Sequence, residues 1–210
     1  MQEQLSSQEF RNGATALAEV VRFLAAKGWT PATSSNFSTR ISHSSDLIAI
    51  SKSGRDKYAF SADDVMVVDS AGRAVAPADA RPSAETLLHT LLYEDAEIGA
   101  VLHTHSMWAT LLTMTDNAAE LVIEGFELLK GLQGVTTHEH REVVPVFDND
   151  QDMTRLAALV RPYWRDHPHI HGFLIRGHGL YTWGRNLAEA RRHVETLEFL
   201  FECIWKIKEK

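Results

Sequence analysis

Apolar residues recur at helical spacing near the start of the chain. Phe10, Leu17 and Leu24 belong to a stripe that repeats every three to four positions, and Gly28 follows the last of them. A stripe with this period predicts an amphipathic helix, and glycine commonly ends one. The pattern therefore predicts an opening helix over residues 8–27 that buries one face in the core.

The pattern changes to short β-prone pieces between residues 33 and 75. The pieces "NFSTRI", "DLIAIS" and "VMVVD" are rich in apolar and β-branched residues, and turns of Ser, Gly and Asp separate them. Such runs predict strands. The segment "DSAGRAV" that follows is typical of a hairpin turn. This region therefore predicts several strands in close succession.

Helices and strands intermix in the next part of the chain. Pro82 stands where a first helical residue is expected, and "RPSAETLLHTLLYED" continues with a Leu-rich face. A strand over 98–104 follows, and Ser106 is placed to cap a helix that runs through Met114. Further on, "EGFELLKGL" predicts a helical turn or two, "EVVPVF" predicts a strand, and "DMTRLAALVRPYW" predicts another helix.

The last part of the chain completes the predicted fold class. "GFLIRGHGLYTWG" predicts a strand, a glycine-flanked turn and a second strand, and a long helix covers about 187–208. Hairpin-connected strands mixed with helices predict an α/β fold with a mixed, mainly antiparallel sheet covered by helices. A chain of 210 residues without internal repeats or a linker is expected to form one domain over 1–210.

Composition narrows the classes of partner. The chain is 44% hydrophobic and 23% charged, with a formal net charge of −7. An acidic balance argues against nucleic acid as a partner, because phosphate backbones require a basic surface. No apolar stretch approaches the ~20 residues of a membrane span, and the first residues lack the features of a signal peptide. We therefore expect a cytoplasmic protein, with its single cysteine, Cys203, in the core.

Two histidines stand two positions apart at the end of the apolar run in "IGAVLHTHSMW". Alternate strand residues point to the same face, so His103 and His105 could hold one metal ion. His178, in "IRGHGLYTW", is the candidate third ligand, because its flanking glycines permit a close backbone approach. Three protein ligands and one open position are typical of catalytic zinc. The alternative is that histidine is merely tolerated in a strand.

Other histidines compete for the metal. The histidines of "HPHIHG" alternate in the same way as the first pair, but the proline in this segment favours a solvated loop. The segment "THEH" supplies a second group of histidines. These competing residues are His138, His140, His167, His169 and His171. The sequence favours surface or packing roles for His43, His89 and His193.

Small polar loops carry donors suited to an anion. "TPATSSNFSTR" and "SKSGRDK" combine turn amides with hydroxyl and amide side chains, which is a pattern of phosphate sites. Lys57 could add a point charge and Arg55 a forked one. "RPSAE" adds Ser83, with Glu85 in the helical segment that follows. The alternative interpretation is that these loops are ordinary β-turns.

Taken together, "SSNFS", "SGRDK", "PSAE", "HTHS" and "GHGLYTWG" resemble the class II aldolase/adducin family in order and spacing. The resemblance covers roughly residues 10–205. It implies a three-layer α/β/α fold around a mainly antiparallel sheet. It also implies a homotetramer with active sites at subunit interfaces. In two places the chain departs from the family pattern: Ser35 replaces a usual glycine, and Ala84 replaces a serine that sugar-phosphate aldolases often have.

The resemblance also implies roles for individual residues. It implies one zinc ion per subunit, bound by His103, His105 and His178. It implies that Glu127, in "FELLKGL", is the acid/base residue, and Glu85 is a supporting candidate as a transient ligand, orienting group or second proton carrier. The residues implied around the substrate phosphate are Thr33, Ser35, Asn36, Ser53, Gly54 and Ser83, with Lys57 as a further candidate.

Three functions remain possible within the family. Secondary blocks such as "GWTPATSSNFS", "FELLKGL" and "DNDQDM" resemble members that remove water from a keto-pentose phosphate in methionine salvage. A sugar-phosphate aldolase or 4-epimerase would use the same metal and phosphate groups. An adducin-like scaffold without catalysis is the third alternative, although it has no need of three metal-binding histidines.

Overall fold

The opening helix forms as the apolar stripe predicts. The computed structural model describes residues 7–42, 46–115 and 117–209, and α2 spans Gln8–Ala26. The Ser7 hydroxyl accepts a hydrogen bond from the Phe10 amide at its start, and Gly28 follows its end at a φ of +78°. A serine cap and a left-handed glycine are ordinary devices for starting and stopping a helix.

The strands form a nine-stranded sheet in the order β4-β3-β2-β1-β5-β9-β8-β7-β6. Neighbouring strands pair antiparallel except β7 and β8, which are parallel. The strands are β1 (Asn36–Arg40), β2 (Ile48–Ser51), β3 (Val65–Val68), β4 (Ala74–Ala76), β5 (Ala100–Thr104), β6 (Glu120–Ile123), β7 (Glu142–Phe147), β8 (Gly172–Ile175) and β9 (Gly179–Gly184). The predicted mixed, mainly antiparallel sheet is confirmed.

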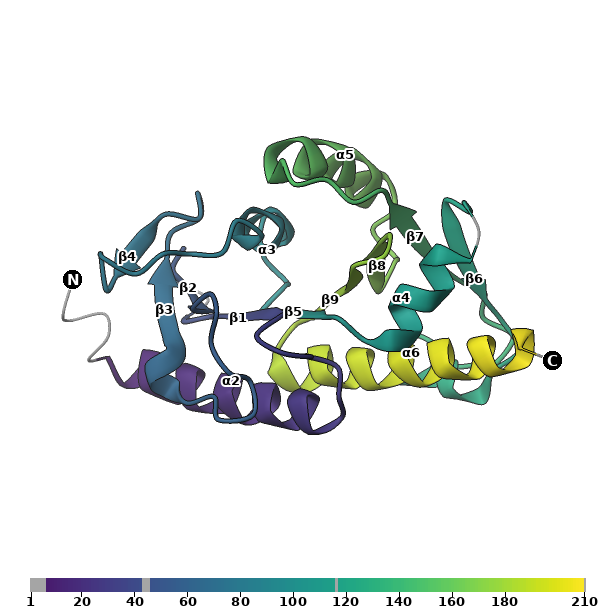
Figure 1. Ribbon diagram of the computed structural model, residues 1–210, viewed down its shortest axis with the longest axis horizontal. Coiled ribbons are helices and arrows are strands. Elements are labelled where there is room, and N and C mark those ends of the chain that lie inside the picture. The colour runs from purple at the N-terminus through teal and green to yellow at the C-terminus, as the bar shows by residue number, and fades with distance from the viewer. Residues whose placement is uncertain (1–6, 43–45, 116, 210) are drawn as a thin grey trace.

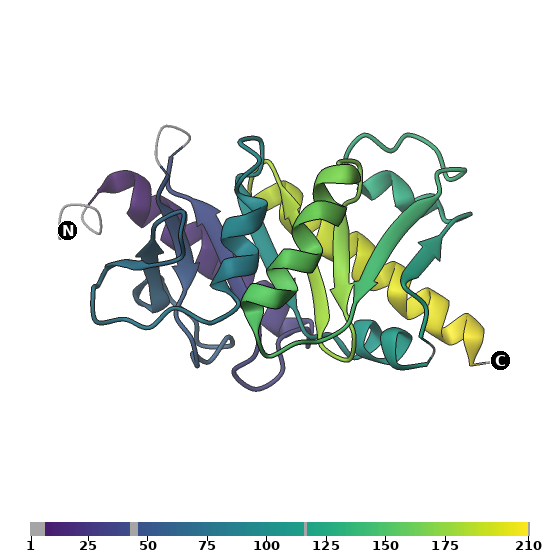
Figure 2. The same ribbon diagram turned by 90° about the horizontal axis from the view of Figure 1, so that it is seen from above.

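Helices cover both faces of this sheet and give the expected three layers. The helices that follow α2 are α3 (Thr86–Leu92), α4 (Met107–Met114), α5 (Met153–Asp166) and α6 (Leu187–Lys208), with 3-10 turns η1 (Ala62–Asp64) and η2 (Glu127–Gly131). Figure 1 shows α3 and α5 above the sheet and α2 and α6 below it. Seen from above in Figure 2, α3 and α5 lie side by side across the strands. None of the helices in the described ranges has an apolar stretch long enough to cross a membrane.

Each face of the sheet has its own buried core. On the α3 and α5 face, Leu88, Leu156 and Phe173 are fully buried in one cluster. On the opposite face, Leu17 of α2 packs with Phe37 of β1 in a second cluster, and a third lies under α4 and α6. The central strands β1, β5 and β9 are therefore covered on both sides, which holds the residues at their ends in fixed positions.

The helix predicted to start at Pro82 begins later. Residues 81–83 are irregular, and α3 begins only at Thr86, whose amide donates to the Ser83 carbonyl. The physical reason lies in the side chains: the Asn36 amide hydrogen-bonds both the Ser83 hydroxyl and the Glu85 carboxylate. These bonds tie the segment to β1 and keep it out of the helix.

Candidate metal centre

The two central strands bring three histidines to one end of the sheet. His103 lies in β5, which pairs antiparallel with β9 so that His103 is opposite Tyr181. His105 directly follows β5, and His178 directly precedes β9. Antiparallel pairing places the end of one strand beside the start of the other, which is why residues distant in sequence meet here.

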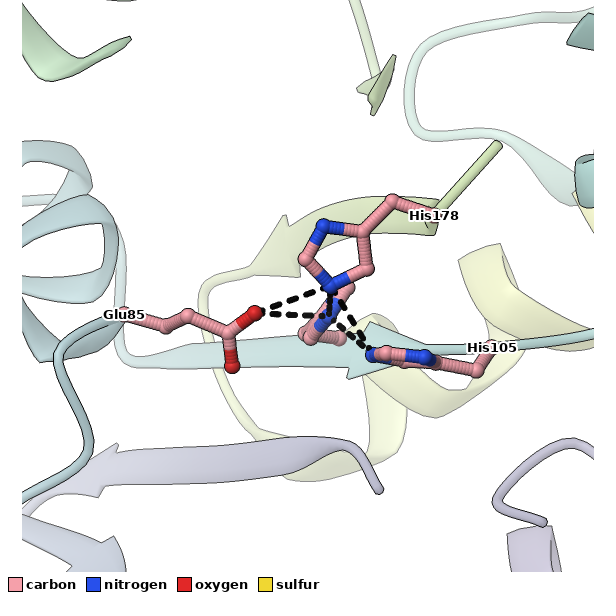
Figure 3. Close-up of side chains that lie close together, drawn as sticks. Glu85, His105 and His178 are labelled. Carbon is pink, nitrogen blue, oxygen red and sulfur yellow. Dashed lines mark hydrogen bonds and ion pairs between the residues drawn. The ribbon is translucent and has the colours of Figure 1, made fainter. Parts of the chain in front are cut away.

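The ring nitrogens of these histidines converge on one point. Nε2 of His105 lies 2.7 Å from Nε2 of His103 and 3.1 Å from Nε2 of His178, and the third pair is 3.3 Å apart. Glu85 joins them from the segment before α3, with its Oε1 2.9 Å from His178 Nε2 (Figure 3). Within the described ranges, these four residues form the group whose ligand atoms all lie within 4.8 Å of one another.

The chemistry of these atoms fits a metal ion. His103 Nδ1 lies 2.9 Å from the Leu180 carbonyl oxygen, which only an N–H can satisfy, so its Nε2 carries a lone pair. Three imidazole nitrogens this close cannot satisfy one another by hydrogen bonds, whereas ligands of one small ion lie roughly 3 Å apart. The geometry therefore favours a cation bound between the rings.

Burial sets the protonation states that metal binding requires. Burial and the neighbouring His105 hold the pKa of His103 well below its usual value, and burial lowers the pKa of His105 to about 4. Burial acts to raise the pKa of Glu85, but its hydrogen bond with His178 and the nearby imidazoles hold it below the ordinary value. At neutral pH His103 and His105 are therefore neutral imidazoles and Glu85 is a carboxylate, which are metal-ligand forms.

A second layer of side chains orients Glu85. The Asn36 amide donates to the carboxylate, and its Oδ1 lies 2.6 Å from His89 Nε2. His89 is fully buried, and its Nδ1 lies 2.7 Å from the Ser38 hydroxyl. Sequence reasoning assigned Asn36 to phosphate binding and His89 to a surface or packing role; His43, assigned the same role, lies outside the described residues. The available signal was the spacing of His89, one helical turn after Glu85.

The glycines around His178 serve the backbone of the sheet. Gly177 has a φ of +62°, which favours glycine in the turn between β8 and β9. A Cβ at Gly179 would collide with the Thr104 carbonyl oxygen of the adjacent strand. The structure therefore explains "GHG" by a tight turn and a close strand pair, whereas sequence reasoning attributed it to metal approach.

A Gly179→Ala protein should be destabilised and should bind metal more weakly. The added methyl group must push β9 away from β5, and overpacking of this kind typically costs ~1–3 kcal/mol. Urea unfolding and a zinc titration measure the two effects. Gly13→Ala is a useful control, because Gly13, like Gly179, has no positive φ, and its added Cβ would meet only the Thr39 methyl group at 3.7 Å, an ordinary contact. Equal losses in the two variants would contradict the steric explanation.

The predicted anion-binding loops lie close to one another. Lys57 is 1% exposed, and its Nζ donates to the carbonyl oxygens of Thr33 (3.1 Å) and Arg55 (2.8 Å). Lys57 therefore ties the two loops together, and burial lowers the pKa of its ammonium group despite nearby acidic residues. Ser35 has a φ of +74°, a conformation that favours glycine, the residue that the resemblance leads one to expect at this position.

The other implied phosphate residues differ in their exposure. Thr33, Ser53 and Gly54 are exposed on the two loops, whereas Asn36 is buried and Ser83 is partly buried beside it. The Ser35 hydroxyl is buried and has no hydrogen-bond partner among the described residues. The charge of Lys57 helps to lower the pKa of His105, so the two loops lie near the histidines. The loops therefore offer hydrogen-bond donors beside the candidate metal centre.

Glu127 lies outside the histidine cluster. It begins η2 with a side chain that is 73% exposed, paired with Lys130 and 4.0 Å from His138 Nδ1. The hydrogen bond with Lys130 lowers the pKa of Glu127. A proton carrier near neutrality needs the opposite shift, so an acid/base role requires that another surface cover this residue.

The competing histidines are engaged elsewhere. The buried Glu142 carboxylate lies 2.8 Å from His140 Nε2 and 3.0 Å from His171 Nδ1. His169 is exposed, and His167 stacks on Tyr163. Within the described ranges, these residues are not part of the four-residue group.

Comparison with known proteins places the fold and the site in a family. A model of the class II aldolase and adducin N-terminal domain matches residues 15–205. The chain belongs to the class II aldolase and adducin family. The four-residue group and the two anion-binding loops lie within the residues that the family model matches.

Two curated relatives of this class II aldolase-family protein are methylthioribulose-1-phosphate dehydratases. A methylthioribulose-1-phosphate dehydratase of Pseudomonas syringae is 52% identical over 91% of this chain and 93% of its own length. That of Marinobacter nauticus is 53% identical over 92% and 93%. The crystal structure of L-fuculose-1-phosphate aldolase from Thermus thermophilus matches at a TM-score of 0.73 and 23% identity, covering 96% of this chain and 95% of that one, which shows the shared fold.

Proposed function

We infer that this chain is a methylthioribulose-1-phosphate dehydratase, a hydro-lyase of methionine salvage. The observation that carries this inference is identity above 50% over nine-tenths of both chains. The cluster of His103, His105, His178 and Glu85 supports it, because the chemistry requires a Lewis acid. The reaction converts 5-methylthioribulose 1-phosphate to 2,3-diketo-5-methylthiopentyl 1-phosphate and water.

We propose zinc as the resident ion, held by the three histidines, with Glu85 beside them. Three histidine ligands leave a coordination position open, which is the catalytic arrangement for zinc. When bound, the ion would stabilise negative charge that develops on the substrate carbonyl oxygen. Asn36 orients the Glu85 carboxylate, so this group is fixed as a ligand or as a proton acceptor at its free oxygen.

The phosphate would be held by the two loops that Lys57 joins. The Ser35 hydroxyl, which has no partner among the described residues, and the exposed Thr33 and Ser53 provide donors without a competing protein acceptor. The amide of Gly54, at a φ of +70°, adds a turn of the kind that binds anions. Anchoring at this end would position the reacting carbons at the metal.

We propose that Glu127 moves the proton between C3 and the departing C4 hydroxyl in the active site of a neighbouring copy. Glu127 is exposed on η2 and lies outside the four-residue group, which supports a role across a subunit interface. We propose that the homo-oligomer is a tetramer. Burial against that neighbour would raise the pKa of Glu127 toward neutrality, as a residue that acts first as base and then as acid requires.

The purified zinc-loaded protein should convert methylthioribulose 1-phosphate to the diketone, and removal of zinc by a chelator should abolish turnover. Product is followed by mass spectrometry as the loss of one water. L-fuculose 1-phosphate serves as the comparison substrate, because an aldolase would cleave its C–C bond. Cleavage of fuculose phosphate without dehydration of the methylthio substrate would overturn the assignment, as would turnover that is insensitive to chelation.

A further inference from the structure

A carboxyl group is buried directly behind the metal-binding strand. Glu198 of α6 is 1% exposed, and its Oε1 accepts a hydrogen bond of 2.7 Å from the Thr104 hydroxyl. Thr104 stands between His103 and His105, on the opposite face of β5 from the His103 ring. The Ser106 hydroxyl, which caps α4 by accepting from the Ala109 amide, interacts with the same carboxyl group.

The surroundings of Glu198 do not stabilise a negative charge. From α6, the nearest acidic neighbours, Glu195 and Glu202, are paired with Arg191 and Lys206. From β5 and the start of α4, the carboxyl group faces the Thr104 and Ser106 hydroxyls. Its α6 neighbours Leu197, Leu200 and Phe201 belong to the apolar cluster under α4 and α6.

No cation therefore compensates this group within the described ranges. Its Oε2 has no hydrogen-bond partner among those residues. Burial raises the pKa of Glu198 to about 7, and the two hydroxyls oppose this rise only in part. A carboxyl group in such an environment is stable as the neutral acid.

We propose that Glu198 is a positioning residue that holds, through its hydrogen bond with Thr104, the strand end that presents His105. It joins α6 to the residues on both sides of His105, while the His105 amide is held from another direction by the Trp29 carbonyl oxygen at 2.8 Å. The His105 ring is thereby fixed in the orientation that brings its Nε2 to the other two nitrogens. The inference rests on the proposed metal-dependent function, because positioning has a purpose only if these histidines bind an ion.

Two substitutions at Glu198 separate hydrogen bonding from charge. Glu198→Gln keeps the size and the acceptor for Thr104 but cannot ionise, so zinc affinity and kcat should remain within about twofold of the wild type. Glu198→Met keeps the length without the hydrogen bond. It should weaken zinc binding about 10- to 100-fold, as the loss of outer-shell partners commonly does. Zinc affinity is measured by competition with a chromogenic chelator, without substrate.

Further variants keep the test decisive. Thr104→Val removes the same hydrogen bond from the other side and should reproduce the Glu198→Met loss even if that variant folds poorly. Glu195→Gln, on the same helix, is the control and should bind zinc normally. Equal losses for Glu198→Gln and Glu198→Met, or normal zinc affinity in both Glu198→Met and Thr104→Val, would overturn the proposal. Absence of dehydratase activity in a wild type that binds zinc tightly would instead count against the proposed function.

The dependence of thermal stability on pH gives an independent readout. The native state holds the Glu198 proton up to a pKa of about 7, whereas the ordinary value is 4.5. The resulting stabilisation is complete below pH 4.5 and is lost as the pH rises through 7. The difference in Tm between Glu198→Gln and the wild type should therefore increase in favour of the variant by several degrees from about pH 5 to pH 8. A constant difference across this range would show that Glu198 is ionised throughout.

Discussion

A His178→Ala protein should lose both bound metal and dehydratase activity. His178 Nε2 lies within 3.3 Å of the other two histidine nitrogens and 2.9 Å from Glu85, so its removal takes one ligand from the centre of the group. Loss of a direct ligand should reduce zinc affinity by more than the roughly 10- to 100-fold typical of an outer-shell partner. Metal content after dialysis and turnover of methylthioribulose 1-phosphate measure the two losses.

His169→Ala is the matched control for this experiment. His169 is also a histidine of the second half of the chain, but it is exposed and lies outside the four-residue group. This variant should keep its zinc and its turnover. Because the His178 side chain is only partly buried, its truncation should leave the fold intact, which circular dichroism verifies. Metal lost from the His169 variant and kept by the His178 variant would refute the proposed centre.

A Glu127→Gln protein should keep its zinc and lose turnover by a factor of about 10²–10⁴, the usual contribution of a positioned general acid/base. The amide preserves the shape of the side chain but can neither accept nor deliver the proton. Zinc affinity should be unchanged, because Glu127 is not among the possible ligands. Steady-state kinetics and metal analysis on the same preparation provide the measurement.

A mixing experiment shows in which subunit Glu127 acts. Co-expressed Glu127→Gln and His178→Ala chains, each inactive alone, should recover activity in mixed oligomers if Glu127 serves the neighbouring site. Random pairing then gives intact sites in roughly one case in four. If Glu127 acts in its own subunit, both kinds of chain remain defective and no activity returns. Full activity of Glu127→Gln alone would transfer the proton shuttle to Glu85 or water.

The sequence predicted the elements of this fold because the relevant signals are local. The stripe from Phe10 to Leu24 and the caps at Ser106 and Gly28 depend on neighbours within a few positions, and each is confirmed. Strand β6 (Glu120–Ile123) was not predicted, and the helix expected from Pro82 begins later because a hydrogen bond from distant β1 holds the segment after Pro82 out of the helix. Local rules cannot anticipate such a contact.

The sequence predicted the three histidines of the candidate site but not the buried side chains that hold this site in position. Alternation in "HTH" is a local pattern, and the structure brings these rings to His178 as expected. The contacts of His89 with Asn36 and of Glu198 with Thr104 join segments more than 50 positions apart. No spacing rule encodes such pairs. A glutamate inside the apolar run "LEFLF" was nevertheless a visible sign of a buried carboxyl group.

The four-residue group draws its members from three segments that meet only where β5 and β9 pair, near the middle of the sheet. An unfolded chain can offer an ion little more than the two histidines of one short segment. Zinc bound as proposed would therefore stabilise the folded chain relative to the unfolded chain, and binding at a hundredfold excess over Kd would add about 2.7 kcal/mol to the free energy of unfolding. Scarcity of the ion would consequently shorten the lifetime of the whole polypeptide, because empty chains would open and meet proteases more often.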